Sequence, residues 1–407
     1  MGFFFKSKSK KRDVRASASS SAEFYGFDDP RFLEFVRNGG GSATNSGITI
    51  SPQLAMKNTA VLRAVSLISF SIGMLPLHLQ NSATKEKATD HSLFRLLHRK
   101  PNSWMTAMEF RTFMQQNILT KGDACALKIM SGERIVQLIP LKNVDIVQND
   151  DWSLTYKVQR NDGRYVIYGQ KDIFHVRNGL SEDGFTGLSF VAQAAEAIAL
   201  SLQAERSTAQ MFKEGLMSGG ALEHPGELSP EAQDRLRGMM EGYKGAANAH
   251  RWMILEEGMS AKTFPSVGRE GQGLEQREMQ IAEIARTFGV PRPLLMMDET
   301  SWGSGTEVLG QFFVKFGLNP MFEIWQQAIS RDLLTEREQD ELEPKFNAGA
   351  LLRGSMKDQA EFFAKGLGSG GHQPWLHPDE PREWMDLPAR SDLPAAMGAD
   401  NGGQNEP

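Results

Sequence analysis

Apolar residues recur at intervals of three and four in three long stretches of the chain, and this spacing is typical of one face of an α-helix. The first stretch ends at Pro76, after which residues 77–80 alternate apolar and polar side chains, as in a strand. The second predicts a helix over residues 191–212, and the third a helix over 272–288 that Gly289 caps. The stripes are Val61, Val65, Ile68, Ile72 and Leu75; Val191, Ala195, Ile198 and Leu202; and Leu274, Ile281, Ile284 and Phe288.

Two further helices are marked by their first residues. Thr106 and Glu109 form a capping-box pattern, in which the hydroxyl and the carboxylate each satisfy an unpaired amide, and it predicts a helix to about residue 119. Ser229 and Pro230 are typical of the cap and the first position of a helix, here ending near residue 243. A short helix is also expected over residues 356–366.

An apolar, aromatic helix is expected to begin at Thr306. Pro320 lies within it and lacks a backbone donor, so we expect a kink there. We expect core packing, and no ligand role, for its aromatic stripe, which consists of Phe312, Phe316, Phe322 and Trp325.

Short strands dominate residues 77–176. Strands over 124–129 and 135–139 flank Ser131 and Gly132, and strands over 156–159 and 165–168 flank the turn sequence 161–163. With a strand over 172–176, these predict a mostly antiparallel sheet with helices laid on it. Later strands are expected over residues 251–255 and 261–264. The fold class is therefore α+β.

The 407 residues allow two or three cores at roughly 100–200 residues per domain. The 45 basic and 50 acidic residues give a net charge of −5, which argues against tight electrostatic DNA binding by the whole surface. A single cysteine, Cys125, excludes an internal disulfide and a multi-cysteine zinc site. No apolar run has the length of a membrane span, so we expect a soluble intracellular protein with no membrane contact.

Motifs of the common enzyme classes are missing from the sequence. It has no GxxxxGK[ST] phosphate loop, no dinucleotide fingerprint, no HExxH and no GxSxG. His91 and His98 stand seven positions apart, and the acidic run over 336–343 is expected to be a solvated face. We therefore expect no catalytic residue, no metal and no cofactor.

Several short motifs occur in a fixed order over roughly residues 50–390, and together they resemble one family. They are Pro101-Asn102 with Thr106 and Glu109-Phe110; Lys121-Gly122-Asp123-Ala124; Gly187-Leu188-Ser189-Phe190; Leu274-Glu275 and Arg277 before Phe288-Gly289-Val290-Pro291; and Leu318-Asn319-Pro320. The set resembles the portal proteins of tailed bacteriophages of the HK97 type. Asp123 and Phe190 replace the family's usual Asn and Pro, and residues 300–307 and 379–382 also depart from its pattern.

The resemblance implies a portal-type fold and a domain order along the chain. We expect a flexible basic N-terminal arm and linker (1–48), wing sheet and helices (49–190), stem helix (191–216), clip (217–265), second stem helix (266–291), tunnel loop (292–306), wing helix and strand (307–352), helical crown (353–388) and disordered tail (389–407). The basic arm is either a solvated tail or a segment that docks on a partner or DNA, and both interpretations stay open.

A portal, as the resemblance implies, is a non-enzymatic ring of about twelve copies packed head to tail at one capsid vertex. It would conduct double-stranded DNA without sequence specificity during packaging and ejection. Its implied partners are the terminase large subunit, the major capsid protein and a head-completion adaptor. It would lie in the virion, and in the host cytoplasm during assembly. A ring with a net negative charge suits this role, because a basic wall would hold DNA in place.

Two sets of residues are expected to make the contacts with partners. The tunnel-loop set would face DNA, and it consists of Thr300, Ser301, Trp302, Ser304 and Thr306, of which Trp302 would alternatively pack on a neighbouring subunit. The clip set would face terminase, and it consists of Glu231, Asp234, Arg235, Arg237 and Lys244. The alternatives are another structural ring or capsid component of a phage-like particle, a gene-transfer-agent portal, or a nucleic-acid-processing enzyme.

Overall fold

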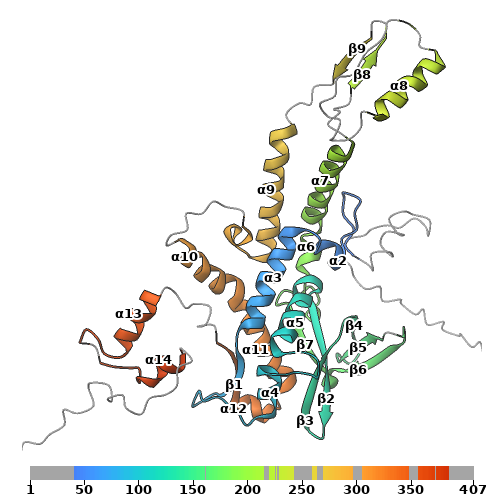
Figure 1. The fold of residues 1–407 in the computed structure, drawn as a ribbon. Coiled ribbons are helices and arrows are strands. Elements are labelled where there is room, and N and C mark those ends of the chain that lie inside the picture. The colour runs from blue at the N-terminus through green and yellow to red at the C-terminus, as the bar shows by residue number, and fades with distance from the viewer. Residues whose placement is uncertain are drawn as a thin grey trace, which may run out of the picture.

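The computed structural model of the chain describes residues 41–160, 162–214, 220–224, 226, 229–242, 259–263, 269–296, 305–347, 356–371 and 373–384 (Figure 1). Its body is built around two packed helices, α3 (Thr59–Met74) and α5 (Ala107–Lys121). The side chain of Asn58 caps α3 by accepting from two amides, and the apolar stripe predicted for this helix is buried. The capping box of Thr106 and Glu109 begins α5, as predicted.

The strands of residues 77–177 are antiparallel, as predicted, but they form three separate sheets and not one. β1 (Leu77–Asn81) pairs with the distant β10 (Leu342–Phe346). A second sheet has the order β3 (Arg134–Pro140), β2 (Asp123–Ser131), β7 (Ile173–Arg177). The third has the order β4 (Val144–Gln148), β5 (Leu154–Gln159), β6 (Tyr165–Gly169).

The third sheet stands apart because it packs on a small core of its own. Cys125, Tyr156 and Ile173 are the buried residues of that core. The large core instead joins α3, α5 and the second sheet to the helices that follow. Short helices α2 (Pro52–Ala55) and α4 (Ser92–His98) complete this half of the body.

Two long helices, α7 (Ala195–Glu214) and α9 (Arg269–Phe288), lie side by side above the body (Figure 1). We call this pair of helices the stalk. The short helix α6 (Phe190–Gln193) precedes α7, with a break at Ala194. The predicted positions Ala195, Ile198 and Leu202 of α7 and Ile284 and Phe288 of α9 are buried, Ile281 is half-buried, and the side chain of Leu274 lies outside the described residues. Gly289 has the left-handed backbone expected of a helix cap. Figure 1 shows the base of the stalk entering the body, where its apolar residues join the large core.

A small unit, which we call the tip, lies at the far end of the stalk (Figure 1). It consists of helix α8 (Pro230–Gly242) and the antiparallel strands β8 (Gly220–Glu223) and β9 (Ser260–Thr263). The hydroxyl of Ser229 accepts from the Ala232 amide, which confirms it as the cap of α8. The strand expected over residues 251–255 lies outside the described ranges.

The aromatic helix differs from its prediction. After the 3-10 turn η3 (Arg292–Leu295), α10 (Gly305–Phe312) continues into a π-helical segment, η4 (Phe313–Leu318), and then α11 (Asn319–Leu333). Phe312, Leu318 and Asn319 all have right-handed helical backbone, so the helix continues through the π-helical segment to Pro320, which lies in the first turn of α11. Prolines and π-helical segments are places where helices bend, so the kink at Pro320 stays a prediction.

The predicted core packing of the aromatic stripe is correct for only half of it. Phe322 and Trp325 are buried, whereas Phe312 and Phe316 are exposed. The neighbouring Phe313 and Val314 take the buried positions instead, because the chain turns the other face of this segment towards the body.

The last described ranges contain three short helices. α12 (Glu336–Glu341) is a largely exposed acidic helix, as predicted for this run, and α13 (Met356–Gly366) matches its predicted bounds. α14 (Asp379–Trp384) follows a turn whose Leu376 packs under Gly366. Within the described ranges, no helix combines the length and apolar character that crossing a membrane requires.

Candidate functional site

Two of the sequence motifs meet in space and join the body to the stalk. Gly122 follows α5 with a φ of 94°, and a Cβ atom placed on it would lie 1.9 Å from the carbonyl oxygen of Gly187. The contact is mutual, since a Cβ on Gly187 would lie 2.2 Å from the carbonyl oxygen of Gly122. Both positions therefore require glycine. Ser189, two residues on, caps α6 and donates its hydroxyl to the Thr120 carbonyl at 2.7 Å.

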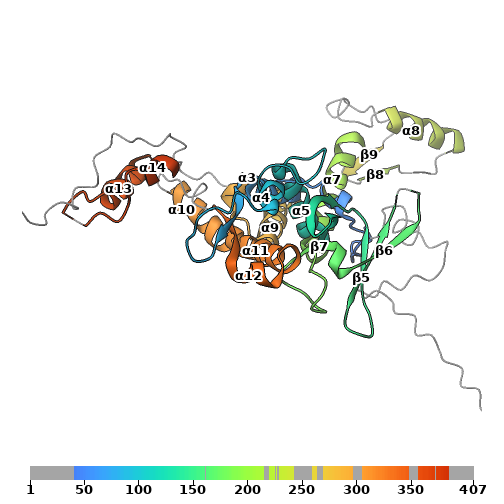
Figure 2. The ribbon, with the colours of Figure 1, turned by 90° about the horizontal axis from the view of Figure 1, so that it is seen from below.

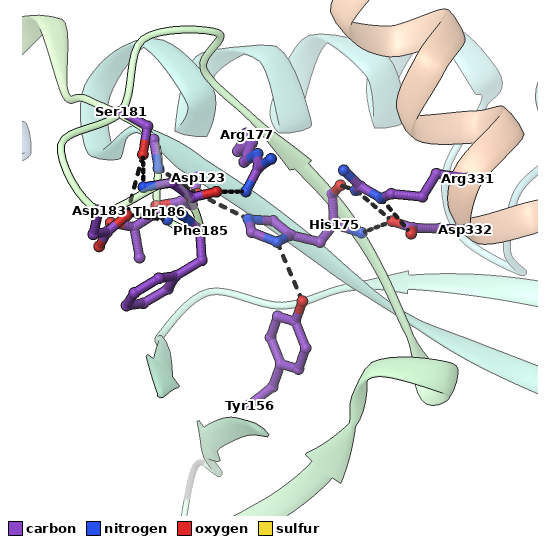
Figure 3. Close-up of polar contacts among 12 residues, drawn as sticks. Asp123, Tyr156, His175, Arg177, Ser181, Asp183, Phe185, Thr186, Arg331 and Asp332 are labelled. Carbon is purple, nitrogen blue, oxygen red and sulfur yellow. Dashed lines mark hydrogen bonds and ion pairs between the residues drawn. The ribbon is translucent and has the colours of Figure 1, made fainter. Parts of the chain in front are cut away.

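Asp123 holds the same junction through its side chain (Figure 3). Its Oδ1 atom accepts from the Gly187 amide at 2.9 Å and lies 2.8 Å from Nε2 of His175. The other ring nitrogen, Nδ1, is 3.2 Å from the hydroxyl of Tyr156. Because an amide oxygen accepts in the same way as a carboxylate oxygen, Asp123 can take the place of the Asn in the resembled motif.

Helix α11 is fastened to β7 beside this network (Figure 3). The His175 amide donates to Oδ2 of Asp332 at 2.9 Å, and Arg331 donates both to Asp332 and to the His175 carbonyl. The hydrogen bonds and charge of Asp332 raise the pKa of Arg331. We call Asp123, Tyr156, His175, Arg331 and Asp332 the junction network.

Burial affects the protonation of two groups at the junction network, the Cys125 thiol and the Tyr156 hydroxyl. Burial, reinforced by the nearby Asp123 and Asp332 carboxylates, raises the pKa of the Cys125 thiol. Burial likewise raises the pKa of Tyr156. Both groups therefore stay protonated at neutral pH, and a protonated, buried thiol is a poor nucleophile. Among the described residues, no group of three or more His, Cys, Asp or Glu side chains is placed to hold a metal ion.

The loop between β7 and the stalk is ordered by one carboxylate. Asp183 accepts from the amides of Phe185 and Thr186, from the Thr186 hydroxyl and from the Ser181 hydroxyl (Figure 3). Burial works to raise the pKa of Asp183, but these hydrogen bonds outweigh it and hold the pKa below its ordinary value. Arg177 closes the loop by donating to the Gly184 carbonyl.

The far half of the stalk lacks cover within one subunit. Residues 203–210 of α7 are exposed except for the half-buried Glu205, so more than one face of the helix meets solvent. Glu205 pairs with Arg277 of α9 at 3.3 Å, and acidic and basic side chains are mixed along both helices. Several of the exposed residues are small, which would permit close approach of another helix.

The residues expected to face terminase lie on α8 of the tip. Glu231, Asp234, Arg235 and Arg237 are exposed, and Asp234 pairs with Arg237 at 3.8 Å on the surface. Lys244 lies outside the described residues. The structure therefore brings four of the five onto one exposed helix.

Most of the expected tunnel-loop residues lie outside the described residues, namely Thr300, Ser301, Trp302 and Ser304. Thr306 lies in the first turn of α10. The first residues of the segment are held by the body: Nε of Arg63 on α3 donates to the Leu294 carbonyl at 3.2 Å.

Sequence reasoning missed the junction network. Asp123, His175 and Asp332 are far apart in the chain, and their only sequence signal was the position of Asp123 in a family motif. It also missed the exposure of Phe312 and Phe316. Phe312, Phe313 and Phe316 stand on more than one face of a helix, so apolar spacing alone did not show which face is buried.

Comparisons with known proteins agree with this architecture. The family model described as phage portal protein matches residues 59–386. The portal protein of Enterobacteria phage HK97 is 31% identical over 335 residues, covering 79% of this chain and 78% of that protein. A probable portal protein of Streptomyces phage phiC31 is 32% identical over 352 residues, covering 81% of this chain and 75% of that protein.

Solved structures share the fold. The neck of an empty gene-transfer-agent particle contains a chain that aligns with a TM-score of 0.59 at 22% identity, covering 88% of this chain and 99% of that one. An HK97-family phage portal protein from Corynebacterium diphtheriae aligns with a TM-score of 0.55 at 17% identity, covering 77% of this chain and 98% of that protein. The family match over most of the chain and the portal-type α+β fold lead to one conclusion: the chain belongs to the phage portal protein family.

Proposed function

We propose that copies of this chain close into a ring at one vertex of a phage-like particle, and that double-stranded DNA passes through the ring. The observation that carries the proposal is the stalk, whose base is buried in the body while residues 203–210 are exposed on several sides. Helices gain most of their stability from packing, so neighbouring stalks side by side would supply the missing contacts. Related neck structures were computed with C12 and C6 symmetry, which supports a ring.

Under this proposal the domains take the portal roles expected from the sequence. The stalk is the stem (191–216 and 266–291), the tip is the clip (217–265), and residues 292–306 are the tunnel loop. The body is the wing (49–190 and 307–352), and the segment over 353–388 is the crown. The major capsid protein would surround the wing.

The charge distribution supports passage of DNA without a fixed grip. The chain has a net charge of −5, and the exposed residues of α7 and α9 carry both signs. Protein that neutralises many phosphates binds DNA tightly, and a wall of mixed charge does not. A bore lined with exposed lysine and arginine would contradict this proposal.

Electron microscopy of the purified full chain tests the ring directly. We expect rings with a central hole, of about twelve copies, and no hydrolysis of nucleotide or DNA. Amide exchange gives a second readout: residues 203–210 should exchange slowly in rings and rapidly in dissociated subunits. A protein that stays a single subunit at all concentrations would refute the function.

The tunnel loop is proposed from position and composition alone. Deleting residues 298–305 should leave rings intact but impair DNA packaging or retention. Replacing Trp302 by Ala separates the two interpretations of that side chain. DNA retention would fall if Trp302 contacts DNA, and ring stability would fall if it packs on a neighbouring subunit.

The tip is proposed as the docking site for the terminase large subunit and for a head-completion adaptor. Its support is the exposed α8 helix with side chains of both signs. Reversing Arg235 and Arg237 to Glu should weaken terminase binding without changing the ring. Equal binding of terminase by the double variant and the unmodified chain would remove α8 from the interface.

The setting can be a phage virion or a gene-transfer agent, because the structural neighbours include a native gene-transfer-agent virion. In either case we propose a location at the capsid vertex, reached by assembly in the host cytoplasm. Sequencing the DNA packaged by particles that contain this chain separates the two, since a gene-transfer agent would carry host DNA.

A further inference from the structure

Four basic side chains gather at the end of the short helix α4, and all four are exposed. Arg95, His98 and Arg99 lie on one face because they are three and four positions apart, and Lys100 follows directly. Within the described ranges, no carboxylate pairs with Arg95, Arg99 or Lys100, whereas basic residues on α8, α12 and α13 have acidic partners. The positive charge at the end of α4 is therefore available to a partner.

The charged groups that act on His98 are positive as well. Burial and then the charge of Arg111 lower the pKa of His98, and a hydrogen bond with the Leu77 backbone offsets them only in part. Arg99 and Lys87 lower the pKa further. Every charged group in this balance is a cation, so an anion bound beside His98 would instead raise its pKa.

A buried arginine offsets the charge that would otherwise repel an anion here. The last carbonyl groups of a helix carry a partial negative charge. Nη1 of Arg111 donates to the Leu97 carbonyl of α4 at 2.7 Å, and Nη2 donates to the Gly73 carbonyl of α3 at 2.7 Å. Burial lowers the pKa of Arg111 to about 10, which leaves it charged at neutral pH. Both of these partners are uncharged, so a positive charge remains beneath the end of α4.

The loop from α4 to α5 presents an aromatic side chain beside these charges. Trp104 is exposed by 60%. Asn102, a residue of the first sequence motif, donates to the Leu138 carbonyl at 3.0 Å and accepts from the Trp104 amide at 3.2 Å. The Ala107 amide closes the loop by donating to the Arg99 carbonyl at 3.0 Å. The loop backbone is therefore fixed before any partner binds. We call the exposed side chains the corner: Arg95, His98, Arg99, Lys100 and Trp104.

The corner lies at the end of the body away from the stalk and the tip (Figure 1). Helices α13 and α14 lie to the side of the body in Figures 1 and 2, so these two described helices do not cover it. The acidic helix α12 meets the opposite end of α4, where Nε2 of His91 is 3.0 Å from Glu338. Negative and positive charge are thus separated along α4.

We propose that the corner binds phosphate groups of the double-stranded DNA held inside the particle. This rests on the proposed function: with terminase docked on the tip outside the vertex, the opposite end of each subunit faces the interior that DNA fills. Lysine and arginine without acidic partners bind the DNA backbone without sequence specificity, and Trp104 adds a large apolar contact area beside them. The corner lies away from the stalk, so the mixed charge of the stalk is unaffected.

Covalently closed circular duplex DNA is the probe, because it cannot thread through a closed ring. Its binding to preassembled rings should weaken as the salt concentration rises. Arg99→Ala combined with Lys100→Ala should reduce the slope of log affinity against log salt by about two or more, since two phosphate contacts are lost from each bound subunit. Lys157→Ala combined with Arg160→Ala, which removes two exposed charges at β5, is the matched control and should leave the slope unchanged.

Two further measurements make the result specific to the corner. The basic N-terminal arm is present in every variant, so the difference between slopes reports the corner alone. The melting temperatures of both double variants should equal that of the unmodified chain, which excludes misfolding. Poly-glutamate is the second probe. If Arg99→Ala with Lys100→Ala abolished its binding and left DNA binding unchanged, the corner would serve an acidic protein instead, and the proposal would be overturned.

Two outcomes separate this proposal from the proposed function. If the unmodified chain forms no rings, the proposed function fails, and the reason for placing DNA at this end of the subunit fails with it. If rings form, and the corner variant binds circular DNA with the same salt slope as the unmodified chain, only the DNA contact at the corner is refuted.

Discussion

At the scale of single residues, the junction depends on a close contact between two backbone segments. Gly122 and Gly187 approach so closely that neither tolerates a Cβ atom. Asp123 then fixes the geometry by accepting from the Gly187 amide. Residues that were noticed only as parts of separate motifs thus form one joint, through which the body holds the stalk.

Gly122→Ala should destabilise the protein by more than about 3 kcal/mol, because the new methyl meets backbone in addition to requiring a left-handed conformation. The measurement is the free energy of unfolding in denaturant. Gly132→Ala is the matched control, since Gly132 has a φ of 63° with open space around it. It should cost only roughly 1–2 kcal/mol. Equal effects of the two substitutions would show that the close approach is not a constraint.

Asp183 stabilises the loop before the stalk, and its contribution to the free energy of unfolding depends on pH. Its folded pKa lies below the ordinary value of 3.8, so its stabilisation is complete above that value and is lost as the pH falls through the folded pKa. Asp183→Ala should therefore lower the free energy of unfolding by about 1 kcal/mol at pH 6. The difference should shrink towards pH 2. Glu182→Ala, at its exposed neighbour, should have little effect at either pH.

At the scale of elements, local signals set the helix ends and the core decides which face is buried. The capping box of α5 was readable because its two partners are three residues apart and satisfy each other. The face of α10 and η4 was not readable, because phenylalanine stands on both sides of the segment and only its packing on the body selects Phe313 over Phe312.

Thr106→Ala should lower the free energy of unfolding by about 1 kcal/mol, because the Glu109 amide loses its acceptor. Chemical denaturation measures the change. Glu109→Gln is the matched control, since glutamine can also bond back to the Thr106 amide in a capping box. If Glu109→Gln lowered the free energy of unfolding as much as Thr106→Ala does, the negative charge of Glu109, and not the capping box, would stabilise this helix.

At the scale of the whole molecule, the stalk and the tip differ in how they depend on the body. The base of the stalk shares the large core with α3, α5 and α11. The tip has its own strand pair, held on its surface by Lys262 and Glu223 at 2.8 Å. The base of the stalk therefore depends on the body for its packing, whereas the described strands of the tip pair with each other.

Replacing residues 217–265 by a short glycine-rich linker should leave the melting temperature of the body within a few degrees of its original value. Rings should still form, and binding of the terminase large subunit should be lost. Calorimetry, electron microscopy and a pull-down measure the three effects. Loss of rings in this variant, while the α8 charge variants still assemble, would mean that the tip backbone contributes to assembly.

The sequence by itself determined the local elements and the family. Helical stripes, the capping box and the turn glycines act over a few residues, so α3, α5, α7, α9 and α13 could be predicted closely, and the ordered motifs identified a portal protein. Only the tertiary structure decided that β1 pairs with β10, that the strands divide into three sheets, and that Asp123, His175 and Asp332 meet. Those contacts join distant parts of the chain, and no short-range pattern encodes which distant partner a strand edge or a buried carboxylate will find.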